Sequence, residues 1–304
     1  MADVVEYTIS EIKSEWSTVR DRSSIEELLI LFLLIPLTLV LVEIAIQSNL
    51  GFFQTVTRGE LRFNITSPDV MTAFLSTYAH DGIAHLRHNI VSYGLIMSAL
   101  YPLAIRIKRR DLLWISLGIH LLITPFLIAW ANVQVPLYET AIGFSGVGAA
   151  LSGLLLILVF IAATGNVERA VNPIWAVAPA SLIMAFILAI LPMRVSYLNP
   201  LPESTAIVAM LGFVFAIAFV IRHGLKTVFS LLDSVLSVGN IIEAWGLIIA
   251  VSAPLGLFVQ VSPQDNVVGH LAGYYLGLAV AVAYCNYGNI HRLPETITDT
   301  IQSG

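Results

Sequence analysis

The sequence predicts an all-α protein, built as a bundle of membrane-spanning helices. Of its 304 residues, 57% are apolar and only 12% are charged. The mean hydropathy is +0.85, and the apolar residues gather in long stretches with few interruptions. Soluble domains carry about 25% charged and about 45–50% apolar residues. A soluble chain of this length could not bury so much apolar surface, so we expect a polytopic membrane protein.

Eight stretches approach the length of about 20 apolar residues with which a helix crosses the hydrocarbon core. They are 26–49, 84–105, 111–131, 145–163, 173–191, 205–222, 241–260 and 267–286. A shorter segment at 226–240 has apolar residues at helical spacing and one polar side, which predicts a helix in the membrane interface. Residues 50–83 are too apolar for a free loop, and we expect them to lie partly in the membrane surface.

The spans divide the chain into a cytoplasmic N-terminal segment at 1–25, a transmembrane domain at 26–286 and a cytoplasmic tail at 287–304. Basic residues favour the cytoplasmic side of a membrane protein. With the N-terminus inside and eight alternating spans, most Lys and Arg residues fall inside. The orientation therefore predicts both termini in the cytoplasm, and the excess of Arg over Lys is typical of a prokaryotic cell membrane protein from a GC-rich or salt-adapted source.

Charge and cysteine content exclude several classes of function. The net charge is −5 and no basic tract is present, so we expect no nucleic-acid partner. Cys285 is the only cysteine, which rules out an intrachain disulfide and a cysteine-based metal site. The first 24 residues lack the short apolar core and small-residue cleavage site of a signal peptide. No cofactor is expected.

Polar residues recur near the start of three even-numbered spans. His85 and Asn89 open the second span and share one helix face. Ser145 opens the fourth, just after Gly143, and His270 opens the eighth. Polar groups inside membrane helices are costly and by default line a functional site or cavity. Because these spans all descend from the outer face, their polar groups are expected at similar depth in the outer half of the membrane.

Small residues mark the same helices. Gly273 and Gly277 line one face of the eighth span, while Ser145, Ala149 and Gly153 recur every four residues along the fourth, with Gly146 next to the serine. Small residues at intervals of four let two membrane helices approach closely. The pattern predicts that the fourth and eighth spans pack against each other and bring their polar residues together.

Each signal also has a simpler explanation. A serine at a helix start is usually a cap, and a lone intramembrane histidine often bonds a neighbouring helix while glycines serve packing alone. A metal site of His80, His85 and His270 is a weaker alternative, because no carboxylate joins them inside a span.

The segments HDGIAHLRHN, GFSG and GHLAGYYLG occur in this order, and together they resemble the rhomboid intramembrane serine proteases. The family pattern is a His followed four residues later by Asn, then Gly-x-Ser-Gly, then a His followed by glycines at the third and seventh positions. The resemblance covers about 70–286 and implies a six-helix core. Three predicted spans separate the serine from the histidine here, instead of one, so about two helices are extra. The family's Trp-Arg pair in the first outer loop is not found.

The resemblance implies roles for these residues. Ser145 would be the nucleophile and His270 the general base of a dyad without an acid. Asn89, His85 and Gly143 would line the oxyanion and substrate site, together with the Ser145 backbone N–H. The implied activity is a serine endopeptidase that cleaves transmembrane segments near the outer face. Its partners would be transmembrane protein substrates and the lipid bilayer.

Two alternatives from other classes stay open at this point. One is a catalytically silent relative that binds membrane proteins without cutting them. The other is a transporter or channel lined by the same polar groups, which predicts paired charges or broken helices near the midplane. The sequence does not define the substrate or the oligomeric state.

Overall fold

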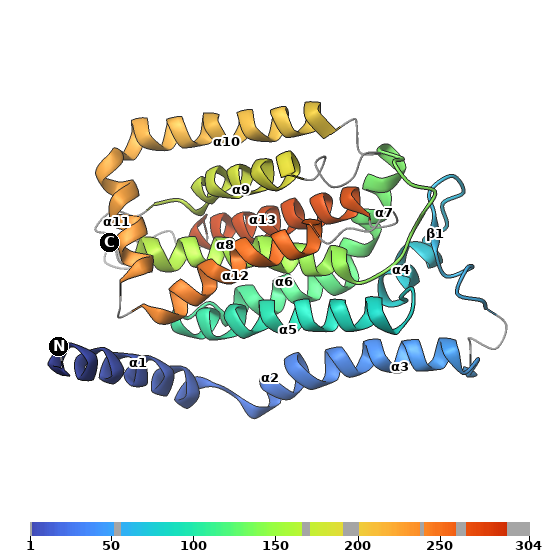
Figure 1. Ribbon diagram of the computed structural model, residues 1–304, viewed down its shortest axis with the longest axis horizontal. Helices are drawn as coiled ribbons and strands as arrows, with labels where there is room; N and C mark the ends of the chain where they lie inside the picture. The colour runs from blue at the N-terminus through green and yellow to red at the C-terminus, as the bar shows by residue number, and fades with distance from the viewer. Residues whose placement is uncertain are drawn as a thin grey trace, which may run out of the picture.

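The computed structural model describes residues 2–51, 56–165, 171–190, 201–237, 240–259 and 266–290. Within them the all-α class is confirmed, since the only strands described are β1 (Phe63–Asn64) and β2 (Thr140–Ala141), which pair antiparallel. The helices, shown in Figure 1, are α1 (Ala2–Arg22), α2 (Ile25–Leu29), the π-helical η1 (Ile30–Leu34), α3 (Ile35–Gln47), α4 (Val70–Tyr78), α5 (Ile83–Arg106), α6 (Arg110–Leu122), α7 (Thr124–Gln134), α8 (Ser145–Gly165), the 3₁₀-helical η3 (Pro173–Ala176), α9 (Val177–Ile190), α10 (Leu201–His223), α11 (Leu225–Leu236), α12 (Ile241–Val259) and α13 (Val267–Ile290).

Several helices are long and apolar enough to cross a membrane, as in a multi-pass membrane protein. In the described part of the chain there are four: Ile25–Gln47, Ile83–Arg106, Ser145–Gly165 and Val267–Tyr287. The number rises to six if two bent pairs each form one span, α6 with α7 at 52° and α10 with α11 at 104°. The sequence predicted eight spans. By length and composition, the described helices provide four to six.

The difference lies mainly in two segments. The segments predicted to span at 173–191 and 241–260 hold η3 with α9, described as far as Ile190, and α12, described as far as Val259. Their described apolar parts, Pro173–Ala189 and Ile241–Leu257, are a little short of a full span. A helix needs about 20 apolar residues to cross the hydrocarbon core. The segment expected in the interface corresponds to α11, which turns away from α10 at Gly224, where φ is +82°.

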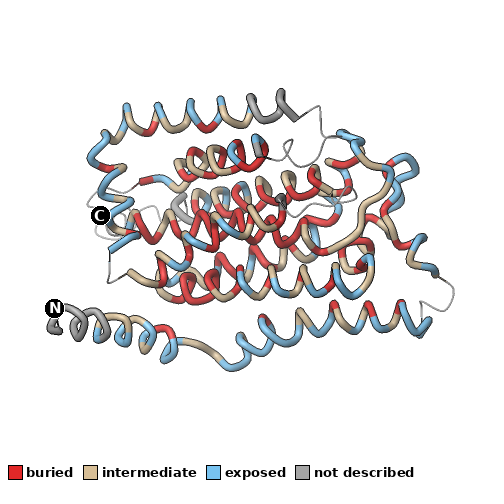
Figure 2. The backbone as a smooth tube through the Cα atoms, in the orientation of Figure 1, coloured by how far each residue is buried: buried red, intermediate tan, exposed pale blue. Residues whose placement is uncertain are grey.

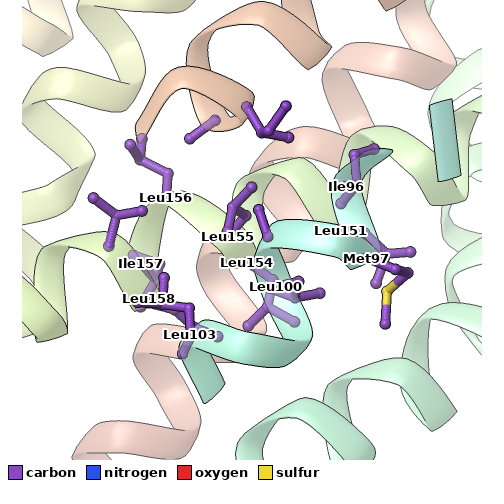
Figure 3. Packing of buried hydrophobic residues seen from close by; sticks show 14 of the residues in the cluster. Ile96, Met97, Leu100, Leu103, Leu151, Leu154, Leu155, Leu156, Ile157 and Leu158 are labelled. Atoms are coloured by element: carbon purple, nitrogen blue, oxygen red, sulfur yellow. The ribbon is translucent and has the colours of Figure 1, made fainter. Parts of the chain in front are cut away.

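Helix α8 forms the centre of the bundle. Its most apolar window is 89% buried inside the protein, which fits a helix that is apolar on all sides. Figure 3 shows side chains of α5, such as Leu100 and Leu103, packed against side chains of α8, such as Leu154 and Leu158. Burial falls off toward α3 on one side and α10 on the other (Figure 2), where exposed apolar side chains face outward.

The loop between α3 and α4 is anchored by its arginines. Arg58 pairs with Glu43, a carboxylate of α3 that is only 2% exposed. Arg62 pairs with Asp81, just before α5. Strand β1 then pairs with β2, which ends shortly before α8. Two ion pairs therefore hold this loop to α3 and to the segment before α5.

A second ionic cluster joins α1 to the opposite end of α5. Arg106 contacts Glu15 of α1 at 2.5 Å and also pairs with Glu243 of α12. It donates a further bond of 2.9 Å to the Asn240 side chain. Burial raises the pKa of the Glu15 carboxyl above its usual range, and the nearby Arg106 only partly offsets this. One guanidinium thus serves two carboxylates and ties three helices together.

We predict that Arg106→Gln lowers the free energy of unfolding by about 3 kcal/mol, because it leaves two largely buried carboxylates without their cation. The folded variant would hold the Glu15 carboxyl at a pKa raised by burial, so its deficit should shrink as the pH falls from 8 toward 5, where the folded state takes up the proton more readily than the unfolded state. Thermal unfolding in detergent at several pH values measures this. Arg20→Gln, at an exposed ion pair, is the matched control and should be neutral. A deficit independent of pH would contradict the account.

Candidate active site

The close approach of α8 and α13 is the first feature of the site. A Cβ added to Gly273 would lie 2.1 Å from the carbonyl oxygen of Gly146, and one added to Gly277 would lie 1.9 Å from that of Ala150. On the facing helix, a Cβ at Gly153 would lie 2.2 Å from the backbone of α13. These distances are too short for any side chain beyond hydrogen. The predicted glycine-lined contact between the two helices is therefore present.

This contact places Ser145 beside His270. The Oγ atom of Ser145 and the Nε2 atom of His270 are 2.7 Å apart, which is a hydrogen bond between residues 125 positions apart. Ser145 is the first residue of α8, and His270 lies in the first turn of α13 and is only 4% exposed. The backbone of Leu257, in α12, lies close to the ring.

The turn that leads into α8 is fixed by two features. Gly143 has φ of +116°, a conformation that side chains disfavour, and a Cβ there would lie 2.5 Å from the His85 ring. Phe144 is fully buried, with ring contacts to Tyr78 and Tyr93. The backbone N–H of Gly143 donates to the Ser76 carbonyl at 2.8 Å. The turn thus fixes the backbone from which Ser145 begins α8.

Asn89 lies on α5 next to this turn. It is 2% exposed, and neither its amide nitrogen nor its amide oxygen has a hydrogen-bond partner among the described residues. Its nitrogen lies 3.5 Å from where a Gly143 Cβ would sit. A buried polar group without a partner is costly and calls for an explanation. This open amide next to the turn before Ser145 makes Asn89 a candidate to bind an oxygen of a ligand.

A small cavity opens between these residues. It measures about 30 Å³ and is lined by parts of α4, α7, β2, α8 and α13, including Ser145 and His270. A water molecule needs roughly 10–15 Å³ of such space, so the cavity can hold about two. The cavity must therefore widen before water and a peptide carbonyl can both reach Ser145.

His80 and His85 form a pair beside the cavity, with ring centroids 5.3 Å apart and an edge-on orientation. Burial lowers the pKa of His80 to about 3, with a further contribution from the neighbouring His85, so its ring is neutral at ordinary pH. Asp81 donates its backbone N–H to the Nδ1 atom of His85 at 3.4 Å. Within the described ranges no three His, Cys, Asp or Glu side chains are grouped to hold a metal ion.

The structure adds residues that sequence reasoning missed. Asn266 caps α13, since its Oδ1 atom accepts the Gly269 N–H at 2.7 Å, and it lines the cavity. Asn132 of α7 and Ser76 and Thr77 of α4 line it as well. Asn266 immediately before an apolar run is a recognisable capping signal. The other three lie in segments without a distinctive motif, and only tertiary packing brings them here.

Comparison of the chain with protein-family models gives no match, and neither the curated proteins nor the solved structures contain a significant match. The functional argument therefore depends on the geometry and on the resemblance of the three short motifs.

We predict that Gly277→Ala destabilises the protein by about 1–3 kcal/mol, because the added methyl group would overlap the backbone of α8. Gly118→Ala is the matched control, since a Cβ on that helical glycine of α6 meets nothing within 4 Å. It should be neutral or stabilising by up to about 1 kcal/mol. Thermal unfolding of the two variants in one detergent makes the comparison. Equal melting temperatures would show that α8 and α13 are not in contact.

Proposed function

We propose that this protein is an intramembrane serine endopeptidase of the rhomboid type, acting through Ser145 and His270. The observation that carries the proposal is the 2.7 Å hydrogen bond between their side chains, in a small cavity between apolar helices. A serine hydroxyl next to an imidazole is the arrangement that activates a weak nucleophile. The order of the three motifs along the chain supports the same activity.

In the proposed reaction, the Ser145 Oγ attacks the scissile carbonyl carbon while the Nε2 atom of His270 takes the hydroxyl proton. His270 then returns this proton to the leaving amine as the peptide C–N bond breaks, which leaves an acyl-enzyme ester. Water, deprotonated by His270, hydrolyses the ester and restores the serine.

The negative charge that develops on the carbonyl oxygen must be stabilised by hydrogen-bond donors. The backbone N–H at the start of α8 belongs to the nucleophile, and the open amide of Asn89 lies next to Gly143, two residues before it. The helix N-terminus favours negative charge there. His85 is placed to contribute from the adjacent turn, and Gly143 leaves room for the substrate backbone. These four groups form the proposed oxyanion and substrate site.

The substrates we propose are transmembrane proteins, because the site lies among apolar helices. Arg106 and Arg109 lie at the other end of α5 from His85 and Asn89, and Arg109 contacts Cys285 near the end of α13. By the positive-inside rule, this basic end would face the cytoplasm of a prokaryotic cell. Both termini would then be cytoplasmic, and cleavage would take place near the outer face.

One observation favours the transporter alternative. Helices α6 and α7 are bent by 52° at a break, and broken helices mark the binding sites of many transporters. The buried His120 and Thr124 bond each other across this break at 3.0 Å. The cavity that α7 lines is, however, only about 30 Å³ and ends at Ser145 and His270. Geometry therefore favours the peptidase.

We predict that a fluorophosphonate probe labels Ser145 covalently in the purified protein, as mass spectrometry of the modified peptide can show. Ser145→Ala and His270→Ala should lose the labelling and should lower cleavage of a transmembrane reporter by about 10⁴-fold or more. Ser152→Ala is the matched control, since that buried serine of α8 only bonds the Gly148 carbonyl. A catalytically silent binder or a transporter would give no labelling at all, and retained cleavage by Ser145→Ala would refute the dyad.

We predict that Asn89→Ala lowers turnover by about 10²–10³-fold, the usual effect of losing one oxyanion donor. Probe labelling of Ser145 should slow but persist, because the dyad is intact. The melting temperature should hold or rise, since the amide makes no bond to the described residues and its burial is costly. Both quantities are measured on one purified sample. A lower melting temperature with unchanged specific activity would assign Asn89 a purely structural role.

A further inference from the structure

Helices α9, α10 and α11 form a unit on one side of the bundle, away from the candidate active site (Figure 1). Helices α9 and α10 pack closely, since a Cβ added to Gly212 of α10 would lie 3.0 Å from Leu182 of α9. Helix α11 then turns by 104° and crosses toward α12. None of these helices contributes a residue to the cavity that holds Ser145.

A large apolar cavity lies between this unit and the core. Its volume is about 290 Å³, and its walls come from α8, η3, α9, α10, α11 and α12. Every lining side chain is apolar, apart from the indole N–H of Trp175. Leu232 of α11 lines the cavity and is also 49% exposed, so the cavity opens to the outside next to α11.

The chemistry of the walls selects the occupant. Water fills a cavity only where it finds about two to four polar partners, and these walls offer almost none. The side chains around an empty cavity lack dispersion contacts on one side. An engineered cavity of about 150 Å³ with apolar walls already binds benzene. This cavity is nearly twice as large and opens on the surface of a membrane protein. The hydrocarbon chain of a bilayer lipid is the apolar group available to fill it.

Charge at the bend indicates which lipid. Arg222 and Lys226 lie on either side of Gly224, between Val220 and Val228, which both line the cavity. Both cations are exposed, and neither forms an ion pair with another described residue. Leucines and a phenylalanine of α11 are exposed beside them, as in a helix that lies in the headgroup region. Basic residues in that position attract anionic headgroups.

We propose that this cavity binds one anionic membrane lipid, with an acyl chain between α8 and the α9–α11 unit and its headgroup at Arg222 and Lys226. The lipid fills the space that the extra helices leave against the core. It therefore acts as a structural component of this side of the bundle. The proposal depends on the membrane location of the chain and is independent of the peptidase activity.

Trp175 provides a built-in reporter, because its ring lines the cavity and contacts Phe219. Brominated acyl chains quench tryptophan on contact, and the difference in emission between the wild type and Trp175→Phe isolates this residue. The protein is placed in phosphatidylcholine vesicles with a small fraction of brominated phosphatidylglycerol or, in parallel, brominated phosphatidylcholine. We expect the anionic lipid to quench Trp175 at a several-fold lower mole fraction. Equal quenching by the two lipids would overturn the proposal.

Two pairs of variants locate the chain and the headgroup. Ala216→Phe places a ring in the cavity and should abolish the preference for the anionic lipid. Ile217→Phe, at a neighbouring residue that is 58% exposed, should keep this preference. The double variant Arg222→Gln with Lys226→Gln should weaken binding of the anionic lipid by about five-fold per cation removed. The control double variant, Lys13→Gln with Arg20→Gln, removes two exposed cations of α1 and should leave this binding unchanged. Unchanged quenching in Ala216→Phe would mean that Trp175 meets only bulk lipid and would overturn the proposal.

A measurement on the unmodified protein guards against a variant that fails to fold. Native mass spectrometry of the wild type, released from phosphatidylglycerol-containing micelles, should retain one phosphatidylglycerol per chain. No retained lipid would overturn the proposal. The wild type could instead form a dimer that dissociates in Ala216→Phe, with equal quenching by the anionic and the neutral lipid. This result would assign the cavity to a second copy of the chain and would also overturn the proposal.

Discussion

The near-contact of the α8 and α13 backbones is the constraint on which the site depends. Gly153, Gly273 and Gly277 remove the side chains that would otherwise separate the two helices. Helices in a lipid environment gain little from hydrophobic burial, so close van der Waals packing of small residues drives their association. With this packing in place, the first residue of α8 and the first turn of α13 meet within a hydrogen bond. A single methyl group at this contact would separate them.

Polar groups in this bundle are concentrated at its two ends. At one end, Arg106 joins α1, α5 and α12 through carboxylates that are largely buried. At the other end, Ser145 and His270 line a small cavity, and the amide of Asn89, next to Gly143, has no partner among the described residues. An ionic cluster with satisfied partners stabilises a fold, whereas an open donor beside a hydroxyl–imidazole pair is the kind of exception that marks a functional site.

The helices between α8 and α12 change how the core meets its surroundings. Six helices of the proposed rhomboid-like core would suffice for the dyad, and α9 to α11 add an outer layer that does not reach it. This layer does not close tightly on α8, and an apolar cavity of about 290 Å³ separates them. A soluble protein would lose stability through such a void, but in a membrane the surrounding hydrocarbon can fill it.

The sequence by itself determined the helical class and the apolar helices that can cross a membrane, and it singled out Ser145 and His270, which the structure brings within a hydrogen bond. Hydropathy, glycine spacing and costly intramembrane polar groups are local signals. The sequence predicted eight spans, whereas the described helices give four, or six if each bent pair is one span, because hydropathy does not show where consecutive apolar helices bend, as between α6 and α7 or α10 and α11. Tertiary structure alone decided that Asn132, Ser76 and Asn266 join the cavity and that one arginine serves Glu15 and Glu243. These contacts link residues far apart in the chain, and no local pattern specifies which distant partners the packing of α8 and α13 brings together.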